Sequence, residues 1–178
     1  MAVRDIYLLG SPVLRQRADE IVTVDAELRA LIDDMFETMG VACGVGLAAN
    51  QVGIARRVAV INAEGQTFAM INPVIVEEGG RASAEEGCLS IPDAFAEVSR
   101  PESVVLEALD ERGNPFRLAA SGLVARAVQH EIDHLDGVLF VDHLSPMKRQ
   151  LLVTRWKKEN RGEGLTRTPR PEESDARS

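Results

Sequence analysis

Residues 121–135 read SGLVARAVQHEIDHL, and the rest of the chain is best understood around this stretch. Apolar and small residues recur in it at three- and four-residue spacings, which predict an amphipathic helix. Ser121 precedes the pattern, and Gly137 follows it as a residue suited to ending a helix. We therefore expect a helix from about Ser121 to about Leu135. The residues that repeat with the helical period are Val124, Ala127, Val128, Glu131 and Leu135.

The same helix carries the pattern H-E-x-x-H at residues 130–134. Residues four apart lie on one face of a helix, so the imidazoles of His130 and His134 can reach one metal ion. Glu131 lies near that face and can contact a water on the metal without binding the metal itself. The pattern predicts a metal-dependent hydrolase, with two ordinary surface histidines as the alternative.

A catalytic metal usually has three protein ligands and one open position, so a third ligand is needed. Downstream the chain offers only His143, and the extended pattern that would supply a third histidine has Phe140 at that place. The ligand must then be sought upstream. Cys88, in the segment EEGCLSIP of residues 85–92, is one candidate because a thiolate binds zinc or iron well. The alternative for Cys88 is an inert buried thiol.

The remaining pattern predicts an α+β domain with mostly antiparallel strands. Helices are expected over residues 25–39, with Asp25 as N-cap and Gly40 as stop, and over residues 146–158. The first of these helices is followed by a small-residue loop that ends at Gln51. The side-chain amide of Gln51 could donate to a developing oxyanion. The expected strands are residues 57–62, 67–72 and 74–77, the last two interrupted by Pro73, and a hairpin of 104–109 with 116–119.

Length and composition predict one catalytic domain over residues 1–160 and a disordered polar tail over 161–178. The tail has almost no apolar side chains, so we expect it to be dispensable for catalysis. A net charge of −8 argues against direct DNA binding. The start lacks an apolar signal region and no run is long enough for a membrane span, which predicts a cytoplasmic protein. In that reducing compartment Cys43 is expected to be a small buried hydrophobe.

Three segments together resemble the signature motifs of peptide deformylases of the bacterial type I branch. They are GVGLAANQ at residues 44–51, EGCLS at 86–90 and QHEIDH at 129–134, and the resemblance extends over about residues 5–160. It implies a metal helix packed between sheets. It also implies one divalent ion, Fe(II), held by Cys88, His130, His134 and a water, with zinc, nickel or cobalt as substitutes.

The resemblance further implies an activity and residue roles. The activity is removal of formate from the formylmethionine of nascent polypeptides, with Glu131 as acid/base. Gln51 and the backbone N–H of Leu89 match the donors to the oxyanion. Val45 and Gly46 match positions whose backbone pairs with an extended substrate. We expect the remaining contacts to the substrate from Gly87, Leu89 and Val128, the last two in an apolar pocket for the methionine side chain.

Two residues depart from the best-known enterobacterial pattern. Phe95 stands where a basic residue often lies beside the peptide. Arg126 lies one turn before His130, where an aliphatic pocket residue is also found, and its simplest interpretation is a surface arginine with its charge in water. The basic segment of residues 148–161 has two interpretations, a solvated helix face and a docking site for the ribosome.

Two rival functions share parts of this evidence. A zinc endopeptidase would use the same helix but would cleave internal peptide bonds. A structural-metal module, docking on the ribosome without turnover, would replace the metal-bound water by a fourth protein ligand. Formate release, casein cleavage and metal binding without either activity distinguish the three.

Overall fold

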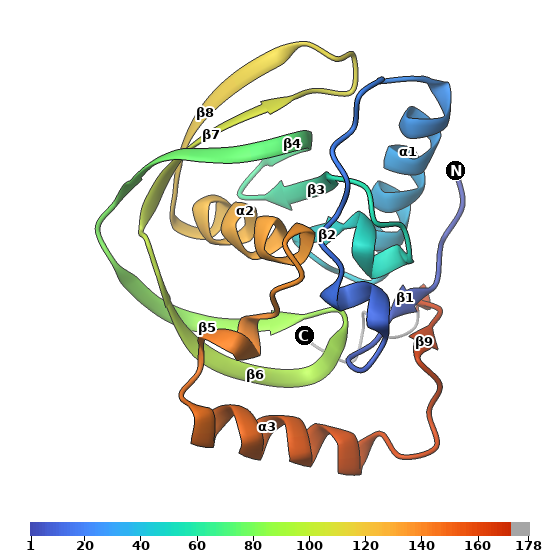
Figure 1. Ribbon diagram of the computed structural model, residues 1–178, viewed down its shortest axis with the longest axis vertical. Helices are drawn as coiled ribbons and strands as arrows, with labels where there is room; N and C mark the ends of the chain where they lie inside the picture. Colours follow the sequence, from blue (N-terminus) through green and yellow to red (C-terminus); the bar gives the residue numbers. More distant parts are fainter. Residues whose placement is uncertain (172–178) are drawn as a thin grey trace.

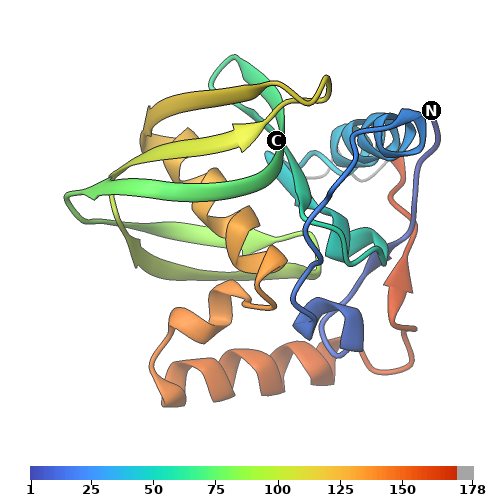
Figure 2. The same ribbon diagram turned by 45° about the horizontal axis from the view of Figure 1, so that its top comes forward.

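A computed structural model describes residues 1–171 and confirms the predicted α+β fold. The long helix α2 (Gly122–Leu135) lies in the middle of the molecule. A five-stranded sheet covers one side of it and a two-stranded hairpin lies on the other (Figure 1). The view in Figure 2 shows α2 running between these two layers. The helix that carries the H-E-x-x-H pattern is therefore enclosed on both sides.

The five-stranded sheet has the order β2-β3-β4-β7-β8, with every neighbouring pair antiparallel. The predicted hairpin of β7 and β8 is confirmed. The predicted break at Pro73 is wrong, because β4 runs through it as one strand. The strand tolerates Pro73 by an irregularity in register between Ile71 and Val74, where Asn72 has a φ of 50°. The strands are β2 (Gly46–Ala48), β3 (Val58–Ala63), β4 (Gln66–Gly79), β7 (Ser103–Leu109) and β8 (Pro115–Ser121).

The second layer is a hairpin that the sequence analysis did not predict. It pairs β5 (Ala82–Cys88) with β6 (Ile91–Arg100) in antiparallel register. Neither strand shows a strong run of β-branched residues, so local propensity gives little signal. The hairpin places Cys88 at the end of β5, next to a tight turn of two residues.

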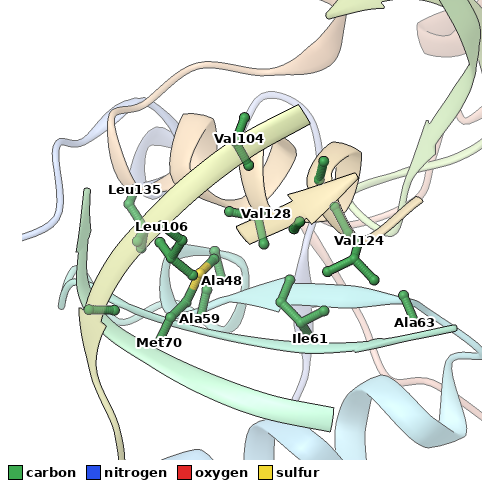
Figure 3. Packing of buried hydrophobic residues seen from close by; sticks show 14 of the residues in the cluster. Ala48, Ala59, Ile61, Ala63, Met70, Val104, Leu106, Val124, Val128 and Leu135 are labelled. Atoms are coloured by element: carbon green, nitrogen blue, oxygen red, sulfur yellow. The ribbon is translucent and has the colours of Figure 1, made fainter. Parts of the chain in front are cut away.

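The core on the sheet side of α2 is mostly aliphatic. Val124, Val128 and Leu135 project from the helix toward strand residues such as Met70 and Leu106 (Figure 3). Val128 is completely buried in this cluster. Burying a side chain of this size stabilises the fold by about 1.5–3 kcal/mol. This packing fixes the rotation of α2 about its axis and so decides which residues face the hairpin.

The end of α2 is fixed by two specific contacts. The buried Arg57 guanidinium donates to the Leu135 carbonyl at 3.1 Å and to the Asp136 carboxylate at 2.9 Å. Gly137 follows with a φ of 77°, and a Cβ there would lie 2.6 Å from the Arg15 carbonyl oxygen. Only glycine fits both the conformation and the space, which confirms Gly137 as the stop.

The other helices flank this centre. Helix α1 (Ala26–Val41) is capped by Asp25, as predicted, but it passes through Gly40 and ends at Val41. Helix α3 (Pro146–Glu159) begins after Ser145 and packs through Trp156. Short 3-10 helices lie between these elements, namely η1 (Pro12–Arg15), η2 (Ala49–Val52) and η3 (Phe140–His143). Within the part of the chain that the structure describes, no helix is both long enough and apolar enough to cross a membrane.

The C-terminal segment corrects the prediction of a disordered tail for residues 161–171. Strand β9 (Thr166–Arg167) pairs antiparallel with β1 (Ile6–Tyr7). The Leu165 carbonyl accepts hydrogen bonds from the Leu8 amide at 2.8 Å and the Ser11 hydroxyl at 2.9 Å. Backbone pairing, to which composition gives no guide, orders this polar segment. The rest of the predicted tail, residues 172–178, lies outside the described residues, and the domain boundary at residue 160 stays a prediction.

Candidate metal centre

Three possible ligands meet between α2 and the β5–β6 hairpin. The Nε2 atoms of His130 and His134 are 3.2 Å apart, and the Cys88 Sγ lies 3.3 Å from the His134 Nε2. A tetrahedral ion with bonds of about 2.0–2.3 Å would hold its ligand atoms roughly 3.3–3.6 Å apart. The three atoms thus have the spacing of three corners of a metal site, and the fourth corner has no protein ligand within residues 1–171.

Glu86 fixes one of these ligands. Its Oε1 lies 2.9 Å from the His130 Nδ1, so the Nε2 of that ring is directed at the cluster. Arg100 contacts both carboxylate oxygens at 2.6 and 2.9 Å, and Arg126 contacts one at 2.7 Å. Burial would raise the pKa of Glu86, but the hydrogen bonds from His130 and Arg100 outweigh it and hold that pKa well below its usual range. Glu86 is therefore a permanent anion behind the site.

The pKa values of the two histidines are shifted in opposite directions. Burial would lower the pKa of His130, but the neighbouring Cys88, Glu86 and Glu131 raise it well above its usual range. Burial and the charge on His130 lower the pKa of His134 well below its usual range. The acidic groups thus stabilise a positive charge at the point where the three ligand atoms converge. A divalent cation at this point would supply that charge and leave both imidazoles neutral.

Glu131 lies against the cluster without joining it. Its Oε2 is buried and has no hydrogen-bond partner among the described residues. Burial raises the pKa of Glu131 to about 7, against the opposing charges of His130 and Arg100. A Cβ at Gly46 would lie 2.5 Å from the Glu131 Oε1, so only glycine leaves room for this carboxylate. A buried, unpartnered carboxylate with a pKa near neutrality is suited to accepting and returning a proton.

Gln51 and Leu89 lie next to Cys88. The Gln51 Oε1 accepts from the Ala48 amide at 3.0 Å, which leaves its Nε2 directed at the hairpin turn. That Nε2 donates to the Ser90 hydroxyl at 3.1 Å and lies 3.6 Å from the Cys88 Sγ. Leu89 follows Cys88 directly in the hairpin turn. The side-chain amide and this turn therefore flank the thiolate, at the place where a carbonyl oxygen would need donors.

A cavity of about 310 Å³ opens beside these groups. Four of the predicted substrate contacts, Val45, Gly46, Gly87 and Leu89, lie in its lining. Val128 does not, because it faces the sheet and is fully buried in the core. The prediction placed it on the wrong face of α2. Other residues of that helix line the cavity instead, namely Leu123, Arg126 and Ala127.

Arg126 is not the surface arginine that the sequence suggested. Its side chain is only 12% exposed. Besides Glu86, it donates to the carbonyls of Val98 and Ala82, both at 2.9 Å. Arg126 therefore ties α2 to both strands of the β5–β6 hairpin while its side chain lines the cavity. No local pattern indicates this role, because the partners of Arg126 lie far away along the chain.

The structure also shows where three further residues from the sequence analysis lie. Phe95 is half-exposed and lies over Gly87, where a Cβ would come within 2.6 Å of its ring. Cys43 is exposed at the rim of the cavity with a φ of 55°, so its interpretation as a buried hydrophobe is wrong. His143 pairs with Asp133 at 2.8 Å and does not belong to the ligand cluster.

A thiolate, two imidazoles and a nearby unpartnered glutamate, open to a cavity, define a mononuclear metallohydrolase site. Comparison with known proteins narrows this class. The sequence profile of a family described as polypeptide deformylase matches residues 3–150. The peptide deformylase 1 of Corynebacterium efficiens is 52% identical, over 84% of this chain and 92% of that protein. The peptide deformylase of Rhizobium meliloti is 44% identical, over 92% of this chain and 98% of that protein.

Solved structures agree. A crystal structure of a peptide deformylase from Legionella pneumophila has a TM-score of 0.85 and 42% identity, over 99% of both chains. One from Ehrlichia chaffeensis in complex with actinonin has a TM-score of 0.86 and 39% identity, over 90% of this chain and 99% of that chain. The chain belongs to the polypeptide deformylase family. It is a metal-dependent hydrolase that removes the formyl group from an N-terminal methionine.

Proposed function

We propose that one divalent ion, Fe(II), is held by Cys88, His130 and His134, and that Glu131 transfers the proton during deformylation. The observation that carries this proposal is the unpartnered, buried Glu131 Oε2 beside three converging ligand atoms. A fourth protein ligand, which a structural-metal module needs, is missing from the group within residues 1–171. The arrangement therefore favours catalysis over a purely structural metal.

A bound divalent ion would supply a water of lowered pKa and would polarise the formyl carbonyl. Glu131 accepts the proton that this water loses and later donates it to the leaving amine. Gln51 and the Leu89 N–H donate to the formyl oxygen as negative charge develops on it. Val45 and Gly46 offer backbone groups to the extended peptide along the edge strand β2. Gly87 and Leu89 contact the methionine side chain in the cavity.

The test is formate release from formyl-Met-Ala-Ser, with casein as a second substrate. We expect formate release without casein cleavage. Casein cleavage without formate release would instead indicate an endopeptidase. A stoichiometric metal with neither activity would indicate a structural module.

Metal identity can be tested through the ligand Cys88. A thiolate next to a redox-active ion is open to oxidation toward sulfenic and sulfinic acid, whereas zinc is redox-inert. We expect the iron-loaded enzyme to lose activity in air faster than the nickel-loaded enzyme. Mass spectrometry should place the added oxygen on Cys88. Cys43 is the internal control, since it is a free and exposed thiol outside the ligand set. Equal lifetimes of the two forms in air would count against Fe(II).

We also propose that the protein binds the ribosome through the basic segment of residues 148–161 and encounters nascent peptides there. Within α3, Arg149 pairs with Asp142 at 3.0 Å and Arg155 pairs with Glu159 at 2.9 Å. Lys157 and Lys158 are exposed in the last turn of the helix, with no ion pair among the described residues. Ribosomal RNA would bind such charges in a salt-dependent manner.

Charge reversal at these lysines tests the proposal. The double substitution Lys157→Glu and Lys158→Glu should weaken co-sedimentation with ribosomes at low salt while formate release from a tripeptide persists. The matched control reverses two exposed arginines elsewhere, Arg29→Glu and Arg112→Glu, with the same change in net charge. Equal loss in both double variants would show a nonspecific charge effect and would refute docking through α3.

A further inference from the structure

The three candidate metal ligands come from two elements that are far apart along the chain. His130 and His134 belong to α2, whereas Cys88 is the last residue of β5 in the hairpin. The Cys88 Sγ lies 3.3 Å from the His134 Nε2, which is close enough for one ion to reach both atoms. The separation between α2 and the hairpin therefore decides whether the three ligand atoms can hold a common ion.

Close backbone packing does not set this separation. Helix α2 packs closely against β2 and β3 of the sheet, but within residues 1–171 its backbone makes no comparable approach to β5 or β6. The hairpin turns toward α2 the face that carries Glu86 and Arg100, which bond His130 and Asp133. Strand pairing places alanines on the same face, at positions 82, 84 and 96. Alanine side chains are short, so longer side chains join the two layers.

Arg126 crosses this distance from the helix. Its Nη1 donates to the Val98 carbonyl at 2.9 Å and to the Glu86 carboxylate at 2.7 Å. Its Nη2 donates to the Ala82 carbonyl at 2.9 Å. Two of these acceptors are backbone atoms on different strands, and the third belongs to a residue two positions before Cys88. Because the acceptors lie on both strands, they fix the distance and the tilt of the hairpin relative to α2.

The other connections between the layers are of a different kind. The pair of Glu86 with His130 and the pair of Arg100 with Asp133 have rotatable side chains at both ends, so they can follow a small shift of the hairpin. Gln129 donates to the Pro101 carbonyl at 3.0 Å, beyond the end of β6. Among residues 1–171, Arg126 is the α2 side chain that bonds the backbone of both hairpin strands.

We propose that Arg126 is a positioning residue of the metal centre and sets the separation between Cys88 on the hairpin and the two histidine ligands on α2. It acts through the hairpin and does not contact the ion. The inference rests on the proposed ligand set. It also gives a reason for a buried guanidinium at this place, since its planar group directs several N–H donors along fixed directions, whereas a lysine ammonium has one nitrogen.

The test uses the full-length enzyme loaded with Co(II), a divalent ion that accepts nitrogen and sulfur ligands. A thiolate bound to Co(II) gives a charge-transfer absorption, whose intensity reports the bond to Cys88. Transfer of Co(II) to a chromogenic chelator gives the rate of release. Arg126→Met removes all three hydrogen bonds but keeps a long side chain. Arg126→Lys keeps the charge beside Glu86 but replaces two donor nitrogens by one.

Val124→Ala is the matched control for a loss of stability. Val124 lies on the same helix, two positions before Arg126, and packs against the sheet (Figure 3). Its truncation weakens the fold without touching a contact to the hairpin. Urea denaturation of each cobalt-loaded variant measures its stability, so a faster release can be compared with the stability that was lost.

We expect Arg126→Met to weaken the thiolate absorption and to release Co(II) about 10- to 100-fold faster than the parent enzyme, as for other residues that orient metal ligands. Arg126→Lys should recover only part of this loss, because the bond to the Ala82 carbonyl depends on the second nitrogen. Val124→Ala should keep the parent spectrum and release rate despite its lower denaturation midpoint. If Arg126→Met does not fold, Arg126→Lys, which keeps the buried charge pair, carries the same comparison.

Three results would overturn the inference. Full recovery in Arg126→Lys would show that the charge alone is sufficient. Equal release from Val124→Ala and Arg126→Met would show that lost stability explains the effect. An unchanged spectrum and release rate in Arg126→Met would show that the hairpin keeps its place without these bonds. A parent enzyme without thiolate absorption, or an absorption that persists in Cys88→Ala, would instead overturn the proposed ligand set.

Discussion

Glu131→Gln is expected to retain the metal and to lose nearly all deformylase activity. Glutamine matches the shape of the carboxylate in the tight space beside Gly46 but cannot accept a proton. Acid–base catalysis by one positioned side chain contributes about 10²–10⁴-fold, so kcat should fall by that factor. The three ligands are untouched, and metal content measured by mass spectrometry should stay near one ion per chain. KM for formyl-Met-Ala-Ser should change much less than kcat.

The fold offers a matched control for this substitution. Glu37 on α1 also has a buried Oε2 without a hydrogen-bond partner among residues 1–171, yet it lies outside the cavity lining. Glu37→Gln makes the same substitution at a half-buried carboxylate outside the cavity and should leave kcat within about twofold of the parent value. If Glu131→Gln lost metal together with activity, Glu131 would be supporting the metal site rather than transferring the proton.

Cys88→Ala is expected to lose tight metal binding, and activity with it. The thiolate is the only anionic group among the three converging ligands, and alanine offers no replacement atom. Two imidazoles alone would hold a divalent ion much more weakly, by about 10²-fold or more, because ligand number and charge set the affinity. Dialysis against a chelator followed by metal analysis measures the loss. Added metal in large excess should restore only part of the activity.

Cys43→Ser is the control for this prediction. Cys43 is a free thiol at the rim of the cavity, outside the ligand cluster, and its substitution should leave metal content unchanged. Stoichiometric metal and full turnover in Cys88→Ala would mean that a different third ligand completes the site.

Features encoded in local sequence were predictable. Helix α2 follows from its apolar period, and the positions of His130, Glu131 and His134 on it follow from helix geometry. The hairpin of β7 and β8 follows from alternating strands around a turn-rich segment. The same local reasoning failed at Gly40, where the helix continues for one more residue because nothing crowds or strains the glycine.

Contacts between distant residues were not predictable in this way. Cys88 and His134 are 46 residues apart, and their approach depends on a hairpin with weak strand propensity. That hairpin forms because it can pair with itself and pack against α2, which is a tertiary effect. The packing of this hairpin against α2 also brings Glu86, Arg100 and Arg126 together behind the metal centre.

The sequence by itself thus determined the metal-binding helix, the β7–β8 hairpin and, through three short motifs, the family. Periodicity along one helix or strand records which residues share a face, and this information is local. The rotation of α2 against the sheet, which buries Val128 and turns Arg126 toward the cavity, was decided only by packing. The position of β9 was likewise decided by backbone pairing with β1, because main-chain hydrogen bonds are available to any sequence and leave little trace in composition.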